Sequence, residues 1–165
     1  MKTKRLILTI LLTLAMCAAA WADGTVSATY TPIDKQTAVI YFAITGDSST
    51  GAKAAFSTDS YSSSGVPYTA LIRGWDLVEV RAYPTAGGTA PLADSDVTIT
   101  ENSLDLLDGN GTDLIQAATT KSTYPKNDGQ PVYTRITSAL TVTVTNQTTA
   151  SADYTIEMRF EKTEL

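Results

Sequence analysis

A short acidic segment carries the side chains best suited to bind a metal ion. Asp105, Asp108, Asn110 and Asp113 lie within nine residues, and closely spaced carboxylate and amide oxygens are the ligands that calcium prefers. The EF-hand pattern fails here, because counting from Asp108 places Asp113 where glycine is needed and Thr119 where an acid is needed. The segment therefore predicts either a calcium site or a Gly/Asn/Asp-rich turn between strands.

Four aromatic residues suggest a second kind of site. Trp75, Tyr61, Tyr68 and Tyr83 would form a sugar-binding platform if their rings were exposed side by side. Aromatic residues of a β-sandwich are more often packed in the core or along strand edges. The sequence leaves both interpretations open, and burial of Trp75 would remove the main support for a glycan site.

No arrangement of residues predicts catalysis. Asp94 and Asp96 resemble a glycosidase carboxylate pair, but Asp-Ser-Asp before a strand is typical of a turn. Asp76 and Glu79 lie at odd spacing on a predicted strand, so they point to opposite faces. The chain contains no histidine, which excludes Ser-His-Asp chemistry and nearly all protein zinc sites. We therefore expect a protein that is not an enzyme and has no cofactor, apart from the calcium alternative.

The N-terminus predicts export. Lys2, Lys4 and Arg5 precede an apolar run over residues 6–20, and Ala20-Trp21-Ala22 forms a small-x-small cleavage site. This three-part pattern is typical of a secretory signal peptide over residues 1–22. A retained membrane anchor is the alternative, although the run is shorter than the roughly 20 residues of a membrane span. Cleavage before a lipidated Cys17 would need a small residue where Met16 stands.

Removal of the signal peptide changes the character of the chain. The segment takes away three of the 12 basic residues and none of the 17 acidic ones, so the net charge falls from −5 to −8. Nucleic acid and anionic membranes are disfavoured partners, because both attract clustered positive charge. The only cysteine, Cys17, is lost as well, which excludes disulfides and is ordinary for a bacterial exported domain. We expect a secreted or periplasmic protein.

Period-2 alternation of apolar and polar residues dominates residues 23–165, and helical periodicity is almost absent. We predict one all-β domain over this range, a β-sandwich or jelly roll of about eight antiparallel strands. Residues 36–45 are apolar on both faces, which favours a central strand covered on both sides. The predicted strands cover residues 25–32, 36–45, 68–83, 96–100, 104–107, 132–137, 140–145 and 154–160.

Several long connections are rich in Gly, Ser, Thr and Pro. Residues 46–65 predict a surface loop with a short strand near 53–57, and loops of this length are uncommon unless they have a function. Residues 84–91 and 124–131 are further Gly/Pro loops. Gly74 lies inside the predicted strand 68–83 and indicates a bulge or bend.

The order of these strands and loops resembles a family of small β-rich proteins encoded among the structural genes of tailed phages and prophages. Its members share a strand ending in a Pro/Gly-rich loop, an Asp-x-Asp-Val-Thr strand, a Leu/Gly-rich turn and two alternating C-terminal strands. The resemblance covers roughly residues 68–161. The matching segments are residues 74–84, 87–91, 94–101, 106–109, 140–144 and 154–160.

The resemblance implies a virion-associated structural role without catalytic residues, although a signal peptide is unusual for virion assembly in the cytoplasm. We therefore expect a structural or surface-interaction module. It would present loops 46–66 and 84–95 and its strand edges to a protein partner or to copies of itself. The alternative is a secreted carbohydrate-binding or adhesin-like module, with or without calcium.

Overall fold

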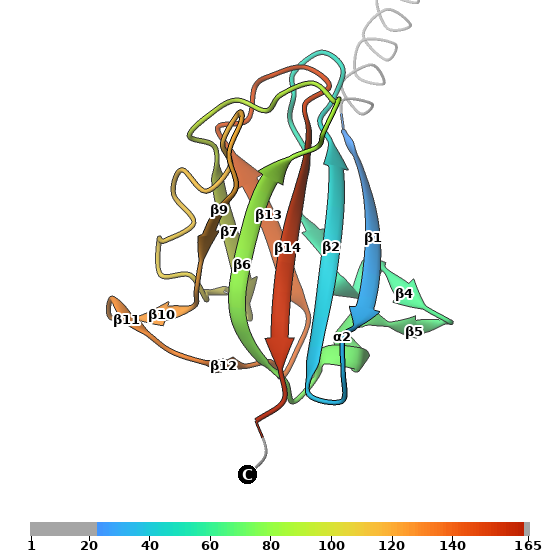
Figure 1. The fold of residues 1–165 in the computed structure, drawn as a ribbon, viewed down its shortest axis with the longest axis vertical. Helices are drawn as coiled ribbons and strands as arrows, with labels where there is room; N and C mark the ends of the chain where they lie inside the picture. The colour runs from blue at the N-terminus through green and yellow to red at the C-terminus, as the bar shows by residue number, and fades with distance from the viewer. Residues whose placement is uncertain (1–22, 164–165) are drawn as a thin grey trace, which may run out of the picture.

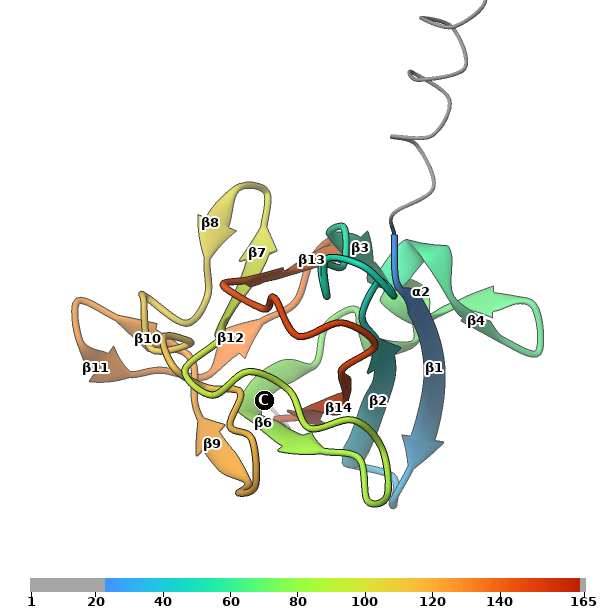
Figure 2. The ribbon, with the colours of Figure 1, turned by 90° about the horizontal axis from the view of Figure 1, so that it is seen from above.

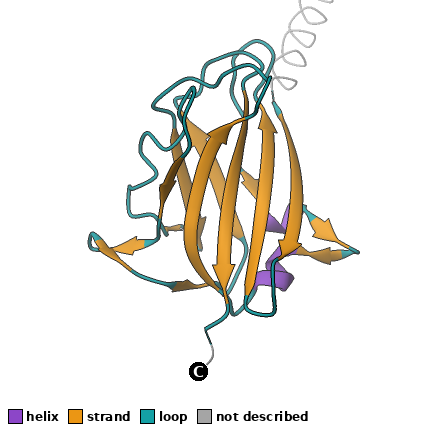
Figure 3. Cartoon of the chain, viewed as in Figure 1, coloured by secondary structure: helices purple, strands orange, loops and turns teal. Residues whose placement is uncertain are grey.

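The computed structural model describes residues 23–163, so the predicted signal peptide over residues 1–22 lies outside the described residues. The described chain is all-β, with two antiparallel sheets packed face to face (Figures 1, 2 and 3). This confirms the predicted fold class. None of the helices within residues 23–163 is long and apolar enough to cross a membrane.

Sheet A contains the four longest strands and forms the front layer in Figure 1. Its order is β1-β2-β14-β6, and two short strands, β9 and β12, pair with the outer edge of β6. The strands are β1 (Thr25–Pro32), β2 (Thr37–Thr45), β14 (Asp153–Glu161), β6 (Asp76–Pro84), β9 (Lys121–Thr123) and β12 (Thr134–Arg135).

Sheet B is smaller and has the order β3-β13-β7-β8. Two further hairpins, β4-β5 and β10-β11, project from opposite sides of the sandwich (Figures 1 and 2). The bounds are β3 (Phe56–Ser57), β13 (Leu140–Thr145), β7 (Asp96–Glu101), β8 (Leu104–Asp105), β4 (Ser62–Ser63), β5 (Val66–Pro67), β10 (Lys126–Asn127) and β11 (Gln130–Pro131). Two short helices, η1 (Thr58–Ser60) and α2 (Tyr68–Ile72), follow β3 and β5.

The core lies between the sheets, and the alternation in the sequence explains its composition. Along β14, Tyr154, Ile156, Met158 and Phe160 are fully buried, whereas Arg159 is exposed. β7 and β13 supply the opposite wall with buried residues at every second position. Because burial of a large apolar side chain contributes about 1.5–3 kcal/mol, this shared core can hold the described domain together without cross-links.

The predicted strand over residues 68–83 was wrong in its first part. Residues 68–72 form α2 and not the start of a strand, because Tyr68, Thr69 and Ile72 bury one side of a single helical turn. Gly74 then reverses the chain at a φ of +82°, a left-handed conformation that glycine adopts without steric cost. It is therefore a turn residue, and β6 begins after it at Asp76.

The other differences from the predicted strands concern whether β2 is covered on both faces and how long two short strands are. β2 is central, between β1 and β14, but no second layer within residues 23–163 covers its outer face, where Val39 is buried, Tyr41 half-buried and Ala43 exposed. The predicted strand over residues 132–137 shortens to β12, and the one over 104–107 shortens to β8.

Glu101 is a buried carboxylate at the end of β7, with 8% of its surface exposed. Its Oε1 accepts hydrogen bonds from the backbone N–H groups of Thr137 (2.6 Å) and Ser138 (2.5 Å) and from both hydroxyls. Burial alone would raise the pKa of this carboxyl, but these hydrogen bonds to the ionised form outweigh it and lower the pKa below 4.5. Glu101 therefore ties the segment before β13 to β7.

We predict that Glu101→Gln lowers the free energy of unfolding at pH 7 by about 1–3 kcal/mol, because hydrogen bonds to a charged acceptor are lost. A carboxyl with a lowered folded-state pKa stabilises the protein above its unfolded pKa, and this stabilisation is lost as the pH falls through the folded pKa. The difference between the two proteins should therefore shrink below about pH 4.5. Chemical denaturation of both proteins at several pH values measures this difference in the free energy of unfolding. Glu161→Gln, on the exposed outer face, is the control, and an equal difference at pH 7 and pH 3 would contradict the assignment.

Candidate functional site

The predicted calcium ligands act as turn-forming acceptors. Asp105 Oδ1 accepts the N–H of Leu107 and Oδ2 accepts the N–H of Gly109, both at 3.0 Å. Asp108 Oδ2 accepts the N–H of Gly129 at 3.0 Å, across to the β10-β11 turn. Their oxygens are therefore directed at backbone donors that would otherwise lack partners.

Lysine ammonium groups contact two of the residues that were predicted as calcium ligands. Lys126 Nζ donates to Asn110 Oδ1 at 2.9 Å, and Lys121 Nζ donates to the backbone carbonyl of Asp113 at 2.9 Å. Within residues 23–163, no group of three or more His, Cys, Asp or Glu side chains is arranged to hold a metal ion. Of the two interpretations, the geometry therefore favours the turn over the calcium site.

This turn packs closely against sheet B. The backbone carbonyl of Gly111 accepts the N–H of Val97 at 2.9 Å, and a Cβ on Gly111 would lie 1.6 Å from the Val97 carbonyl oxygen. Asp96 Oδ1 accepts the N–H of Asp113 at 2.8 Å, and its Oδ2 accepts Asn146 Nδ2 at 2.6 Å. Asp96, at the start of β7, therefore connects the turn at Asp113 and the residue after β13, Asn146, to sheet B.

The predicted aromatic platform is not assembled. Tyr68 is 3% exposed and donates its hydroxyl to the Ala28 carbonyl at 3.0 Å. Tyr61 packs between Tyr68, Phe42 and Phe56, with ring centroids 5.6–6.4 Å apart. Tyr68 belongs to the core, as expected when a tyrosine finds an internal partner for its hydroxyl, and Tyr61 is half-buried against the core.

The other two aromatic residues of the predicted platform, Trp75 and Tyr83, lie apart from Tyr61 and Tyr68. Trp75 packs against the core beside α2 and is half-buried. Tyr83 lies on the outer face of sheet A, where burial and then the nearby Glu157 raise the pKa of its hydroxyl. Trp75, Tyr61, Tyr68 and Tyr83 therefore do not share one exposed surface, which favours the packing interpretation over a glycan platform at these four residues.

Within residues 23–163, the strongly exposed aromatic rings are two tyrosines, one in the predicted turn-rich loop 124–131 and the other in the predicted strand 132–137. Tyr133 exposes 76% of its surface and Tyr124 exposes 46%. Both border a cleft of about 270 Å³, which we call the tyrosine cleft. It is lined by Val78, Glu79, Ser122, Thr123, Tyr124, Tyr133, Arg159 and Glu161.

A β-bulge forms the floor of the tyrosine cleft. The pairing of β14 with β6 shifts by one residue here, since Phe160 pairs with Leu77 whereas Arg159 pairs with Glu79. Val78 is the extra residue. Leu77 and Val80 are both fully buried, so the bulge turns Val78 and Glu79 outward together and places an apolar patch beside a carboxylate.

The strand arrangement next to the bulge brings the two tyrosines together. β9 pairs with β6 from Val80 to Ala82, and β12 pairs with Asp76 and Leu77, so the outer edge of β6 has no paired strand opposite Val78 and Glu79. The chain leaves the sheet at Tyr124 and returns at Tyr133, enclosing the β10-β11 hairpin. Tyrosines at both ends of a polar, Gly/Pro-containing loop were the sequence signal for this arrangement.

Charged side chains line the side of the cleft formed by β14. Arg159 Nη2 lies 3.1 Å from Glu161 Oε1, and each side chain exposes 44% of its surface. On β6, Arg81 Nε lies 3.5 Å from Glu79 Oε1. Exposed pairs of this kind contribute little to stability, and their partial exposure leaves these charged side chains accessible to a ligand.

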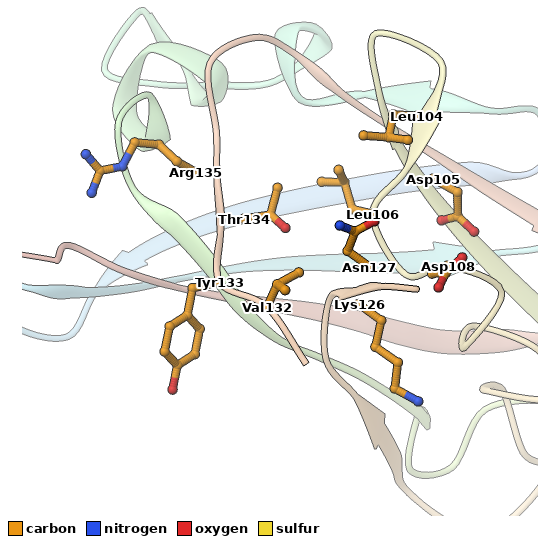
Figure 4. Close-up of a pocket in the computed structure, with 10 residues that line it drawn as sticks. All are labelled: Leu104, Asp105, Leu106, Asp108, Lys126, Asn127, Val132, Tyr133, Thr134 and Arg135. Carbon is orange, nitrogen blue, oxygen red and sulfur yellow. The ribbon is translucent and has the colours of Figure 1, made fainter. Parts of the chain in front are cut away.

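Two further hollows adjoin the tyrosine cleft. One of about 530 Å³ is lined by Val78, Tyr124 and Tyr133 together with Pro125, Pro131 and Val132. The other, of about 390 Å³, lies between β8, β10 and β12, where Figure 4 places Asp105 and Asp108 on one side and Tyr133 and Arg135 on the other. Tyr133 borders all three hollows.

Comparison of the chain with protein-family models, with curated proteins and with solved structures gave no match.

We predict that the protein has the same melting temperature in calcium chloride as in a chelator. In both conditions, Asp105→Ala should lower the free energy of unfolding by about 1–2 kcal/mol. The loss follows because the N–H groups of Leu107 and Gly109 lose their acceptor. Thermal and chemical denaturation measure both effects. Stabilisation of the unmodified protein by calcium that disappears in Asp105→Ala would restore the calcium interpretation.

Proposed function

We propose that the chain is a non-enzymatic, exported β-sandwich that acts as a structural or surface-interaction module, related to the virion-type proteins of phages and prophages. It would work by strand pairing with a second copy of itself or with a strand of a partner protein. The observation that carries this proposal is the free edge of β1.

β1 is an eight-residue edge strand that pairs only with β2 among the described strands. It contains no charged residue and no bulge, and its proline stands at its last position, Pro32. Natural proteins usually protect such edges with charges, prolines or bulges, because the outward N–H and C=O groups are a template for another strand. β1 lacks these devices over Thr25–Thr31.

The hydrogen-bond pattern identifies which groups of β1 are available. Ile33 donates to the Thr37 carbonyl at 2.9 Å, so in this ladder the odd-numbered residues face β2 and the even-numbered ones face outward. The Tyr68 hydroxyl donates to the Ala28 carbonyl in agreement with this pattern, so that one outward group is already satisfied. The outward groups of Val26 and Tyr30 are thus directed away from β2, as strand addition requires.

The other sheet edges are protected. In sheet B the edge strands β3 and β8 have two residues each, and on the far edge of sheet A the short β9 and β12 cover β6. Very short edge strands offer few hydrogen bonds to an incoming strand. This contrast supports β1 as the docking edge, and twofold antiparallel pairing of two β1 strands would give a closed dimer.

We predict that the double substitution Ser27→Lys and Thr29→Lys weakens self-association, because two like charges on each facing strand repel and disfavour edge pairing. Both side chains are exposed, so the fold should be retained. Light scattering coupled to size-exclusion chromatography over a range of concentrations should give a dimer or larger assembly for the unmodified protein and a monomer for the variant.

The matched control adds the same charge at exposed loop positions, as Ala86→Lys and Ala118→Lys, and should leave the assembly unchanged. A monomer at all concentrations for the unmodified protein would contradict self-association. Equal dissociation by both double variants would point to a general charge effect and not to the β1 edge.

A further inference from the structure

We propose that the tyrosine cleft is a binding site for a neutral carbohydrate chain. The proposal does not rest on the pairing of β1, because the cleft lies over β14 and β6 at the other side of sheet A, with β2 between it and β1. The site uses Tyr124 and Tyr133 and none of the four aromatic residues that the sequence had suggested.

The two exposed tyrosine rings supply the stacking surface. A pyranose ring has an apolar face of C–H groups, and these weakly positive hydrogens are attracted to the negative face of an aromatic ring. Tyr133 and Tyr124 expose 76% and 46% of their surfaces, while Lys126 Nζ lies 5.5 Å from the centroid of the Tyr124 ring. This cation–π contact helps to hold Tyr124 in place.

The polar groups around the rings match the hydroxyls of a sugar. Each hydroxyl both donates and accepts, so a site for neighbouring hydroxyls needs donors and acceptors side by side. Arg159 Nη2 and Glu161 Oε1 lie 3.1 Å apart and are both accessible. Ser122 and Thr123 line the same cleft from β9.

The charge of the cleft disfavours an anionic ligand. Glu79 and Glu161 outnumber Arg159 among its lining residues, and the chain without residues 1–22 carries a net charge of −8. Phosphates, nucleic acids and uronic acids would be repelled, since they require a surplus of positive charge. A neutral glycan meets no such barrier.

The three adjoining hollows suit a chain and not a single sugar. The tyrosine cleft and the larger hollow share Val78, Tyr124 and Tyr133, and the hollow in Figure 4 shares Tyr133 with both. Tyr133 is therefore the central contact of an extended site. Both tyrosines directly adjoin residues of the sheet, Thr123 in β9 and Thr134 in β12, which lowers the ordering cost of binding.

A proline-rich peptide is the competing ligand, because exposed tyrosines beside Pro125 and Pro131 also suit a polyproline helix. The tyrosine cleft itself favours the sugar. Five of its lining residues are hydrogen-bonding or charged side chains other than tyrosine, namely Glu79, Ser122, Thr123, Arg159 and Glu161.

The test is affinity electrophoresis of the purified protein in native gels that contain xyloglucan, galactomannan, hydroxyethylcellulose or amylose. Polygalacturonate serves as the anionic comparison and poly-L-proline as the peptide comparison. We expect retardation by at least one neutral polysaccharide and none by the two comparison polymers. Tyr133→Ala should raise the dissociation constant at least about tenfold, whereas Tyr133→Phe, which keeps the ring, should bind within about threefold of the unmodified protein.

Tyr83→Ala is the matched control, because it removes a tyrosine from the outer face of sheet A away from the cleft, and it should leave retardation unchanged. Circular dichroism and melting temperature verify that each variant is folded. The proposal is overturned if no neutral polysaccharide retards the protein, if Tyr133→Ala binds as tightly as the unmodified protein, or if poly-L-proline binds in preference. A protein that binds glycan but remains monomeric would support this site and contradict self-association through β1.

Discussion

The central position of the last strand is the constraint on which the rest of the structure depends. β14 pairs along its whole length with β2 on one side and with β6 on the other, and its four inward side chains are fully buried. The two halves of sheet A meet only through this strand. Contacts of such long sequence separation must be closed before the core is complete, which makes folding depend on the C-terminal segment.

The candidate site follows from the same strand. The register shift against β14 turns Val78 and Glu79 outward together, and the outer face of β14 contributes Arg159 and Glu161 beside them. The outer edge of β6 is then left open opposite the bulge, because β9 and β12 pair with different parts of that strand. A bulge, an interrupted edge and two tyrosines together produce a cleft on an otherwise regular sandwich, in keeping with the frequent placement of bulges beside functional sites.

The proposed functions use different ends of one sheet. β1 offers backbone groups of an uncharged edge, whereas the tyrosine cleft offers side chains on a bulged strand at the other edge. A module that associates through β1 would present its tyrosine clefts away from the interface. Several weak glycan sites held in one assembly would then gain avidity, so the structural and the carbohydrate-binding interpretations are compatible.

Local pattern alone determined the strands with one buried and one solvated face. Residues 140–145 were predicted with the bounds of β13, and residues 154–160 were predicted within one residue of the bounds of β14, because alternation with period two is a property of neighbouring residues. Only the tertiary structure decided the pairing register, the bulge at Val78 and the helical turn over Tyr68–Ile72. It also decided that Asp105 and Asp108 accept hydrogen bonds from backbone N–H groups, and that Tyr68 is buried and Tyr61 half-buried while Tyr124 and Tyr133 are exposed. These outcomes depend on which distant segments pack together, and the identity of a residue carries no such information until the chain has folded.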